Sequence, residues 1–366
     1  MSEYDWTATD DLLKQLVDES IVPGCCLSVR LKGSEIYNKA YGLSEIRPTL
    51  RQATVNTIWD LASITKVLCT AHLYMFWANN GQINLDDSLQ TWLPDAPSNI
   101  RIMDCLTHSS GYPNWRALYS KYLRTQEQWG EPKTRKTILH RAVTSRLTGT
   151  PQKSYAYSDI GFLALCAVAE ARFGKPIHIL WQEFLPSNAK EGLFWGHPDA
   201  AATEDCPIRD RVVIGEVHDL NAAVLGGKST HAGLFGTASS LTKAAQWSLD
   251  AYHGRCDEVE TSTVKYFWGT KGAGSHCLGW DTPSDSGSTA SDYWPKNGVG
   301  HLGFTGTSLW IAPTEELIVG FTSNRVHPRV EGGALPSAVV GPKTKRYRAF
   351  RPQLHAAVLQ TVGAIQ

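Results

Sequence analysis

The stretch Ile58-Trp59-Asp60-Leu61-Ala62-Ser63-Ile64-Thr65-Lys66 decides how this chain is interpreted. A short apolar and aromatic run ends at Ser63, and a helical pattern begins there and stops at Asn79-Asn80-Gly81. The stretch therefore predicts a strand followed at once by a helix, with Ser63 in the first helical turn. The residues that form the apolar face of this helix are Val67, Leu68, Ala71, Leu73, Tyr74, Phe76 and Trp77.

A serine in the first turn of a helix is well placed to act as a nucleophile. Its hydroxyl lies beside unpaired backbone N–H groups, and the positive end of the helix dipole favours nearby negative charge. Lys66 is three positions further on, so it lies on the same helical face. A lysine that is partly desolvated tends to lose its proton and could take one from the serine. The pair predicts a nucleophile with its base one turn away.

The Ser-x-x-Lys pattern alone is not specific, because this chain contains four copies of it, beginning at Ser63, Ser187, Ser240 and Ser262. By spacing alone, each copy is an ordinary capping serine with a solvated lysine. Ser187 falls in a turn, Ser240 is interpreted as the cap of a surface helix, and Ser262 follows an acidic segment. Only Ser63 lies at an apolar strand-to-helix junction, which makes it the candidate nucleophile.

The composition describes an ordinary globular protein of one large or two closely joined domains. The chain has 366 residues, of which 42% are hydrophobic, and its 35 basic and 35 acidic residues balance. A chain without net charge has no overall field to attract nucleic acid, so we expect a small-molecule or peptide substrate and no nucleic-acid partner. The sequence does not indicate an oligomeric state.

The eight cysteines lack any Cys-x-x-Cys pair and several fall in apolar runs, which predicts buried free thiols in a reducing compartment. The histidines show no metal-ligand spacing, so we expect no metal and no cofactor. No segment is long and apolar enough to span a membrane, and no signal-peptide pattern is present. We expect a cytoplasmic location for the chain as it stands, and a periplasmic one if a presequence has been removed.

Short strands are expected near both ends of the chain and helices mostly between them. This arrangement predicts an α+β fold in which an antiparallel sheet, built from both chain ends and flanked by helices, receives an inserted helical region. We expect a discontinuous sheet domain, 1–80 with 236–366, a mainly helical domain at 81–235, and the active site at their junction. Residues 175–235 are interpreted as irregular. The expected strands are 25–31, 36–41, 277–280, 298–304, 307–311 and 317–323, and the expected helices are 6–18, 63–79, 100–106, 160–173 (capped by Ser158 and closed by Gly174), 240–252 and 350–363.

Two further segments could complete an acyl-transfer site with Ser63 and Lys66. Tyr157, beside the capped start of a helix, is a candidate proton carrier. The segment 300–307 has strand character and glycines that let a substrate approach its backbone. The order Ser63-Ile-Thr-Lys66, Tyr157-Ser-Asp159, His301-Leu-Gly303 resembles the serine β-lactamase and penicillin-binding-protein superfamily. It is most similar to the class C β-lactamase-like branch, which includes D-Ala-D-Ala carboxypeptidases, D-amino-acid peptidases and esterases.

The resemblance, which extends from about residue 20 to residue 330, implies a β-lactamase-like fold and a serine hydrolase that works through an acyl-enzyme. It implies that Ser63 is acylated, that Lys66 is its base or proton partner, and that Tyr157 carries the proton to the leaving group. The backbone N–H groups of Ser63 and Phe304 would form the oxyanion hole. Thr305 would lie where its hydroxyl could meet a substrate carboxylate.

Two residues depart from the pattern of the superfamily. Asp159 replaces the usual asparagine, and a carboxylate cannot donate a hydrogen bond to a substrate amide unless it is protonated. His301 replaces the lysine of Lys-Thr-Gly, and at neutral pH it is a weaker anchor for an acidic substrate. We therefore expect a peptidase similar to D-Ala-D-Ala carboxypeptidases, or a carboxylesterase, with weak or no β-lactamase activity.

Other interpretations remain open from the sequence. The segment 222–229, ending in Gly227-Lys228-Ser229, fits a relaxed phosphate-loop pattern, although the strand before it and the helix after it are not indicated. A catalytically inactive penicillin-binding module is a further alternative, which the presence of Ser63 and Lys66 disfavours. His218 and Asp219 could bind substrate or only hold a loop.

Overall fold

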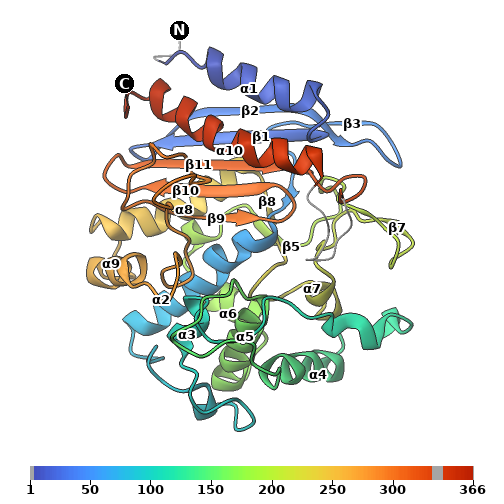
Figure 1. Ribbon diagram of the computed structural model, residues 1–366, viewed down its shortest axis with the longest axis vertical. Helices are drawn as coiled ribbons and strands as arrows, with labels where there is room; N and C mark the ends of the chain where they lie inside the picture. Colours follow the sequence, from blue (N-terminus) through green and yellow to red (C-terminus); the bar gives the residue numbers. More distant parts are fainter. Residues whose placement is uncertain (1–3, 332–340, 366) are drawn as a thin grey trace.

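A six-stranded antiparallel sheet joins the two ends of the chain in this computed structural model, which describes residues 4–331 and 341–365. The strand β1 pairs with β2 as a hairpin and with β11 on its other side, so Cys25 lies opposite Ser323. The sheet therefore confirms the α+β prediction (Figure 1). In spatial order the strands are β3 (Arg51–Gln52), β2 (Ser34–Glu45), β1 (Gly24–Leu31), β11 (Leu317–Ser323), β10 (Thr307–Ala312) and β9 (Val299–Gly303).

Both faces of the sheet are buried because helices cover each of them. The terminal helices α1 (Thr7–Asp18) and α10 (Pro342–Thr361) pack on the face that carries Leu27, Val319 and Phe321. The helix α8 (Ala238–Tyr252) lies on the opposite face, where it contacts β1 and β11, and α9 (Thr261–Gly269) packs against it. Figure 1 shows α10 in front of the sheet and α8 behind it, with both termini at the same end of the molecule.

The segments between the two halves of the sheet are mainly helical. They form the part of the molecule below the sheet in Figure 1. The helices are α2 (His72–Asn79), α3 (Ile102–Leu106), α4 (Pro132–Val143), α5 (Asp159–Phe173), α6 (Ile177–Phe184) and α7 (Leu220–Val224), with 3₁₀ turns at Ala62–Ile64, Leu89–Thr91, Leu118–Tyr122, Gln126–Gln128 and Ser187–Ala189. The short strands are β4 (Trp59–Asp60), β5 (Leu193–Trp195), β6 (Asp205–Cys206), β7 (Arg211–Val212) and β8 (Leu234–Gly236), with β4, β8 and β5 forming a small sheet. The division of the chain into domains at 80/81 and 235/236 stays a prediction.

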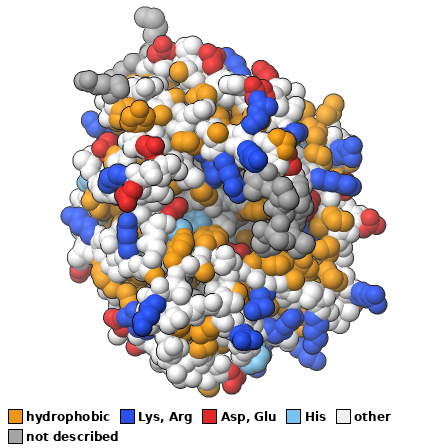
Figure 2. All heavy atoms as spheres, in the orientation of Figure 1, with side chains coloured by type: hydrophobic (Ala, Val, Ile, Leu, Met, Phe, Trp, Pro, Cys, Tyr) orange, Lys and Arg blue, Asp and Glu red, His pale blue; other side chains and the backbone are white. Residues whose placement is uncertain are grey.

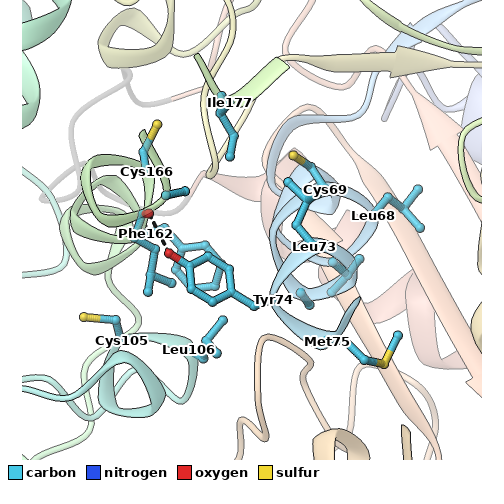
Figure 3. Close-up of a cluster of buried hydrophobic side chains, with 14 of the residues drawn as sticks. Leu68, Cys69, Leu73, Tyr74, Met75, Cys105, Leu106, Phe162, Cys166 and Ile177 are labelled. Carbon is cyan, nitrogen blue, oxygen red and sulfur yellow. Dashed lines mark hydrogen bonds between the residues drawn. The ribbon is translucent and has the colours of Figure 1, made fainter. Parts of the chain in front are cut away.

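The helix that follows Ser63 anchors this helical region to the sheet. Its apolar face packs against α3, α5 and α6, and the hydroxyl of Tyr74 donates to the backbone oxygen of Leu165 (Figure 3). Close-packed contacts of this kind hold a helix to within small displacements. The position of Ser63 is therefore set by a large buried core on one side and by the sheet on the other.

Several local predictions were wrong. Ser240 is not a helix cap, because the extended residue Thr237 caps α8 and Ser240 lies in the first turn. Residues 277–280 form no strand, and only Cys277 makes an isolated bridge to Lys271. The region 175–235 is less irregular than expected, since it contains α6, α7 and four short strands.

The eight cysteines are all free, as expected, and all but Cys256 are buried. The described residues contain no helix that is long and apolar enough to cross a membrane. The phosphate-loop alternative lacks its context, because the helix α7 comes before Gly227 and the strand β8 follows Ser229, which reverses the required order.

Candidate active site

Ser63 lies in a 3₁₀ turn, Ala62–Ile64, that leads directly into a π-helical turn, Lys66–Ala71, and then into α2. The residue before the serine, Ala62, has a φ of 46°, a left-handed conformation that is costly for a residue with a Cβ atom. The carboxylate of Asp60 holds this turn, because it accepts the backbone N–H of Ala62 at 2.8 Å and that of His218 at 2.7 Å. The chain is thus bent sharply at Ser63 and fixed there by a buried acid.

The ammonium group of Lys66 lies at the centre of the site. Its Nζ atom is 3.0 Å from the Oγ atom of Ser63, 2.7 Å from a carboxylate oxygen of Asp159 and 3.2 Å from the backbone oxygen of His231. The lysine side chain is fully buried, whereas Ser63 remains partly exposed. The structure therefore brings the predicted nucleophile and its proton partner together on one helical turn.

Tyr157 completes the group. Its aromatic ring lies beside Lys66, with Nζ 5.0 Å from the ring centre, and it is placed by the N-terminus of α5, where Ser158 caps the helix by accepting the N–H of Gly161. Asp159 is the first residue of that helix. Because Tyr157 and Asp159 flank one cap, a single local structure delivers both side chains to Lys66.

The protonation state of Lys66 differs from the expectation. Burial lowers the pKa of Lys66, but the charge of Asp159 and the interactions with Tyr157 outweigh this effect and hold the pKa above its ordinary value. Burial raises the pKa of Tyr157, although the neighbouring Lys66 ammonium opposes the rise. At neutral pH the resting site therefore contains a charged lysine paired with Asp159 and a neutral phenol. Asp159 is occupied by this ion pair rather than free for a substrate.

The turn after β9 approaches the Ser63 turn from the sheet side. Thr307 and Thr305 donate hydrogen bonds to the backbone oxygens of Leu61, at 3.0 Å, and Asp60, at 2.7 Å. A Cβ atom on Gly303 would lie 2.7 Å from the oxygen of Leu61, so only glycine permits this approach. The hydroxyl of Thr305 is fully buried in its bond to Asp60, which corrects the prediction that it faces a substrate carboxylate.

The exposed residue Phe304 follows Gly303 directly, in the turn between β9 and β10. Its ring stacks on that of His218, with the ring centres 5.6 Å apart, and its backbone oxygen accepts a hydrogen bond from Arg325 at 2.6 Å. Figure 2 shows a hollow near the centre of one face of the molecule, with a histidine side chain visible in its wall. The roles of the Ser63 and Phe304 N–H groups as oxyanion donors stay a prediction.

The residues His218 and Asp219 hold the loop that faces the site. Asp219 accepts hydrogen bonds from the backbone N–H of Ala222, at 2.7 Å, and from Nε2 of His231, at 2.9 Å, and the backbone oxygen of His231 accepts a hydrogen bond from Lys66. The interactions with His231 lower the pKa of Asp219 to about 2, against the opposing effect of burial. This chain of contacts fixes the carbonyl that faces Lys66, which is a role that the sequence did not indicate for His231.

A group of three buried histidines lies beside Tyr157 and was not anticipated. His301, on β9, is joined by His108, from the segment after α3, and by His276, and the ring of Tyr157 lies 4.5 Å from that of His108. Burial is the main cause that lowers the pKa of each of the three, so they are neutral at pH 7. The cluster is the one group in the described ranges that could offer three metal-type ligands. No sequence spacing joins these positions, since they meet only in the fold.

The fold places the chain in one class of protein, the serine hydrolases with a β-lactamase-like fold. The model of the family described as Beta-lactamase matches residues 9–340, so the chain belongs to the Beta-lactamase family. Its relatives carry out hydrolytic reactions of several kinds, and the family alone does not select one of them.

Two curated relatives and one solved structure illustrate this range. The chain is 28% identical to the N-acetylmuramyl-L-alanine amidase of Bacillus subtilis (strain 168), over 86% of this chain and 81% of the relative. It is 26% identical to a protein named putative D-alanyl-D-alanine carboxypeptidase from Escherichia coli (strain K12), over 91% of this chain and 87% of the relative. The structure of EstCE1, a hydrolase with promiscuous acyltransferase activity, has a TM-score of 0.72 at 18% identity and covers 96% of this chain and 97% of its own. This last likeness concerns the fold.

Proposed function

We propose that the protein is a serine hydrolase that forms an acyl-enzyme on Ser63. The observation that carries the proposal is the 3.0 Å contact between Lys66 Nζ and Ser63 Oγ at a partly exposed serine, with Tyr157 alongside. A serine becomes nucleophilic when an adjacent group takes its proton, and these two side chains are within reach of that task.

Acylation requires one proton to leave the Lys66–Tyr157 pair, because both groups carry theirs in the resting site. The pair then removes the proton of Ser63 as Oγ bonds to the substrate carbonyl, and it passes that proton to the leaving group. Both pKa values are raised, so the active form grows as pH rises above neutrality. The Asp159 carboxylate holds the charge of Lys66 in place during this exchange.

The substrate best suited to the site is an ester or amide with no free carboxylate beside the reacting bond. The position that would carry a lysine in the superfamily pattern holds a buried neutral histidine, His301, and the charge of Lys66 is already matched by Asp159. An acidic substrate would therefore meet no unmatched cation at these positions. This argument favours an esterase over a D-Ala-D-Ala carboxypeptidase, and it disfavours β-lactams, which carry a carboxylate.

The carboxypeptidase remains a second candidate because curated relatives that cover most of the chain bear that name. A panel of p-nitrophenyl acetate, a D-Ala-D-Ala peptide and nitrocefin separates the two, with wild type and Ser63→Ala tested on each. We expect hydrolysis of the ester to exceed that of the other two substrates and to be lost in Ser63→Ala. Ester hydrolysis that survives this substitution would remove Ser63 from its proposed role.

A further inference from the structure

The three histidines beside Tyr157 have a donor and acceptor pattern that defines a ligand. The nitrogen atoms that His108, His276 and His301 could offer to a ligand lie within 4.8 Å of one another. The side chains are almost fully buried, with exposed fractions of 1%, 6% and 2%. Buried polar atoms are nearly always hydrogen-bonded in folded proteins, so a cluster of this kind calls for an occupant.

In His108 and His301, the backbone group that each ring contacts determines which ring nitrogen carries the proton. The backbone N–H of Ser158 donates to Nδ1 of His108 at 2.9 Å, so this nitrogen carries the lone pair and the proton is on Nε2. In His301, Nδ1 lies 2.8 Å from the carbonyl oxygen of Leu302, which can only accept, so the proton is on Nδ1 and Nε2 is bare. Among the described residues, neither of the two Nε2 atoms has a hydrogen-bond partner.

The third ring follows the same reasoning. Nδ1 of His276 lies 2.8 Å from the hydroxyl of Tyr155 and 3.5 Å from a carboxylate oxygen of Asp281. The carboxylate favours a proton on Nδ1, which leaves Nε2 of His276 as an acceptor. The cluster thus presents one N–H donor, from His108, and two lone pairs, from His276 and His301.

This pattern does not suit a metal ion. Three histidine ligands would need three lone pairs, and His108 could supply one only by giving up its bond from Ser158. An ammonium group fits no better, because it cannot accept from His108.

We propose that His108, His276 and His301 bind the water molecule that hydrolyses the acyl-enzyme, and that a small primary alcohol, which accepts from His108 and donates its one proton to His276 or His301, can take the place of the water. A water oxygen accepts from His108 and donates to His276 and His301, which satisfies all three nitrogens. The proposal rests on the proposed function, and it assigns the acyl acceptor of that same site.

The reaction balances with the residues already described. As its oxygen bonds to the acyl carbon, the bound water turns one of its two O–H groups from its histidine acceptor to the deprotonated Lys66–Tyr157 pair, which takes that proton. The bond between the acyl carbon and Ser63 Oγ then breaks, and the pair returns the proton to Oγ. The products are the free acid and the restored serine, or an ester when an alcohol takes the place of water. The histidines position the acceptor and exchange no proton in the net reaction.

Burst kinetics with p-nitrophenyl acetate test the proposal, because the burst reports acylation and the steady state reports loss of the acyl group. In His301→Phe and His276→Phe we expect acylation within about threefold of wild type and deacylation slowed by about a hundredfold, the size of effect expected when a reactant is displaced by about 1 Å. Intact mass should then show the acyl group accumulating on Ser63. The burst amplitude reports the concentration of folded, active enzyme in each variant. The matched control is His355→Phe, which replaces a buried histidine on α10 and should leave both rates unchanged.

Methanol supplies a second readout that a merely structural role would not change. In wild type, the fraction of product appearing as methyl ester should saturate with methanol concentration, and in both variants it should rise linearly. Equal losses of acylation and deacylation would overturn the proposal, as would one equivalent of Zn²⁺ bound by wild type and lost in His301→Phe. If wild type gives no acyl group on Ser63 at all, the proposed function fails together with this inference.

Discussion

Replacing Asp159 with asparagine should move the activity of this enzyme to lower pH. In the structure the carboxylate lies 2.7 Å from Lys66 Nζ, and the side chains are 19% and 0% exposed. Two charges about 4 Å apart at an effective dielectric constant of about 20 interact by about 4 kcal/mol. Part of this is lost to solvent at Asp159, and the remainder holds the proton on Lys66, so we expect the pKa of the Lys66–Tyr157 pair to fall when the carboxylate is removed.

The assay is the pH dependence of kcat/KM for p-nitrophenyl acetate, whose ascending limb reports the proton that must leave the free enzyme. In Asp159→Asn the midpoint of this limb should shift to lower pH, because the charge that raises the pKa of Lys66 is gone. Glu183→Gln is a matched control, because it removes the same charge from the exposed pair with Lys175 and should leave the limb in place. An unmoved or upward-shifted limb in the folded Asp159→Asn variant would refute the reasoning that this carboxylate holds the proton on Lys66.

Three further predictions concern the stability and geometry of the site. Gly303→Ala should reduce kcat/KM with p-nitrophenyl acetate by at least tenfold, because the new methyl group would collide with the oxygen of Leu61 and push β9 away from the nucleophile. The pKa of Asp219 is lowered to about 2, so the stability that its carboxylate contributes is present above about pH 4 and is lost as pH falls through 2. Urea titrations over this range should show that the free energy of unfolding falls by about 2 kcal/mol in the wild type, and this fall should be absent in Asp219→Asn. Ala62→Gly should relieve the left-handed backbone at φ 46° and raise the unfolding free energy by up to about 1 kcal/mol, and thermal unfolding would contradict this if the variant were less stable.

Local patterns in the sequence predicted most of the fold. The apolar run ending at Ser63 marked the junction between β4 and the helical segment that follows, and Ser158 and Gly174 marked both ends of α5, where Ser158 caps the helix and Gly174 takes the left-handed conformation. These features depend on residues a few positions apart, and their physical causes are local. The strands β10 and β11 were equally clear because β-branched and aromatic residues surround a single turn.

Features that depend on distant contacts were not accessible from the sequence. The charge of Lys66 is set by Asp159, 93 positions away, and its pKa therefore moved in the direction opposite to that expected from burial. The sequence also contained no sign that the backbone oxygen of His231 accepts a hydrogen bond from Lys66, or that His108 and His276 lie side by side. Helix α6 was not predicted because its N-cap residue, Pro176, makes no side-chain hydrogen bond to the helix, so the sequence carries no capping signal there.

The most direct test of the account is the site of covalent labelling by a fluorophosphonate, read by intact mass and peptide mapping. We predict one adduct per chain in the wild type, located on Ser63, and none in Ser63→Ala, with labelling slowed by orders of magnitude in Lys66→Ala. A label on any other residue of the wild type, or a label that persists in Ser63→Ala, would contradict the assignment of the nucleophile.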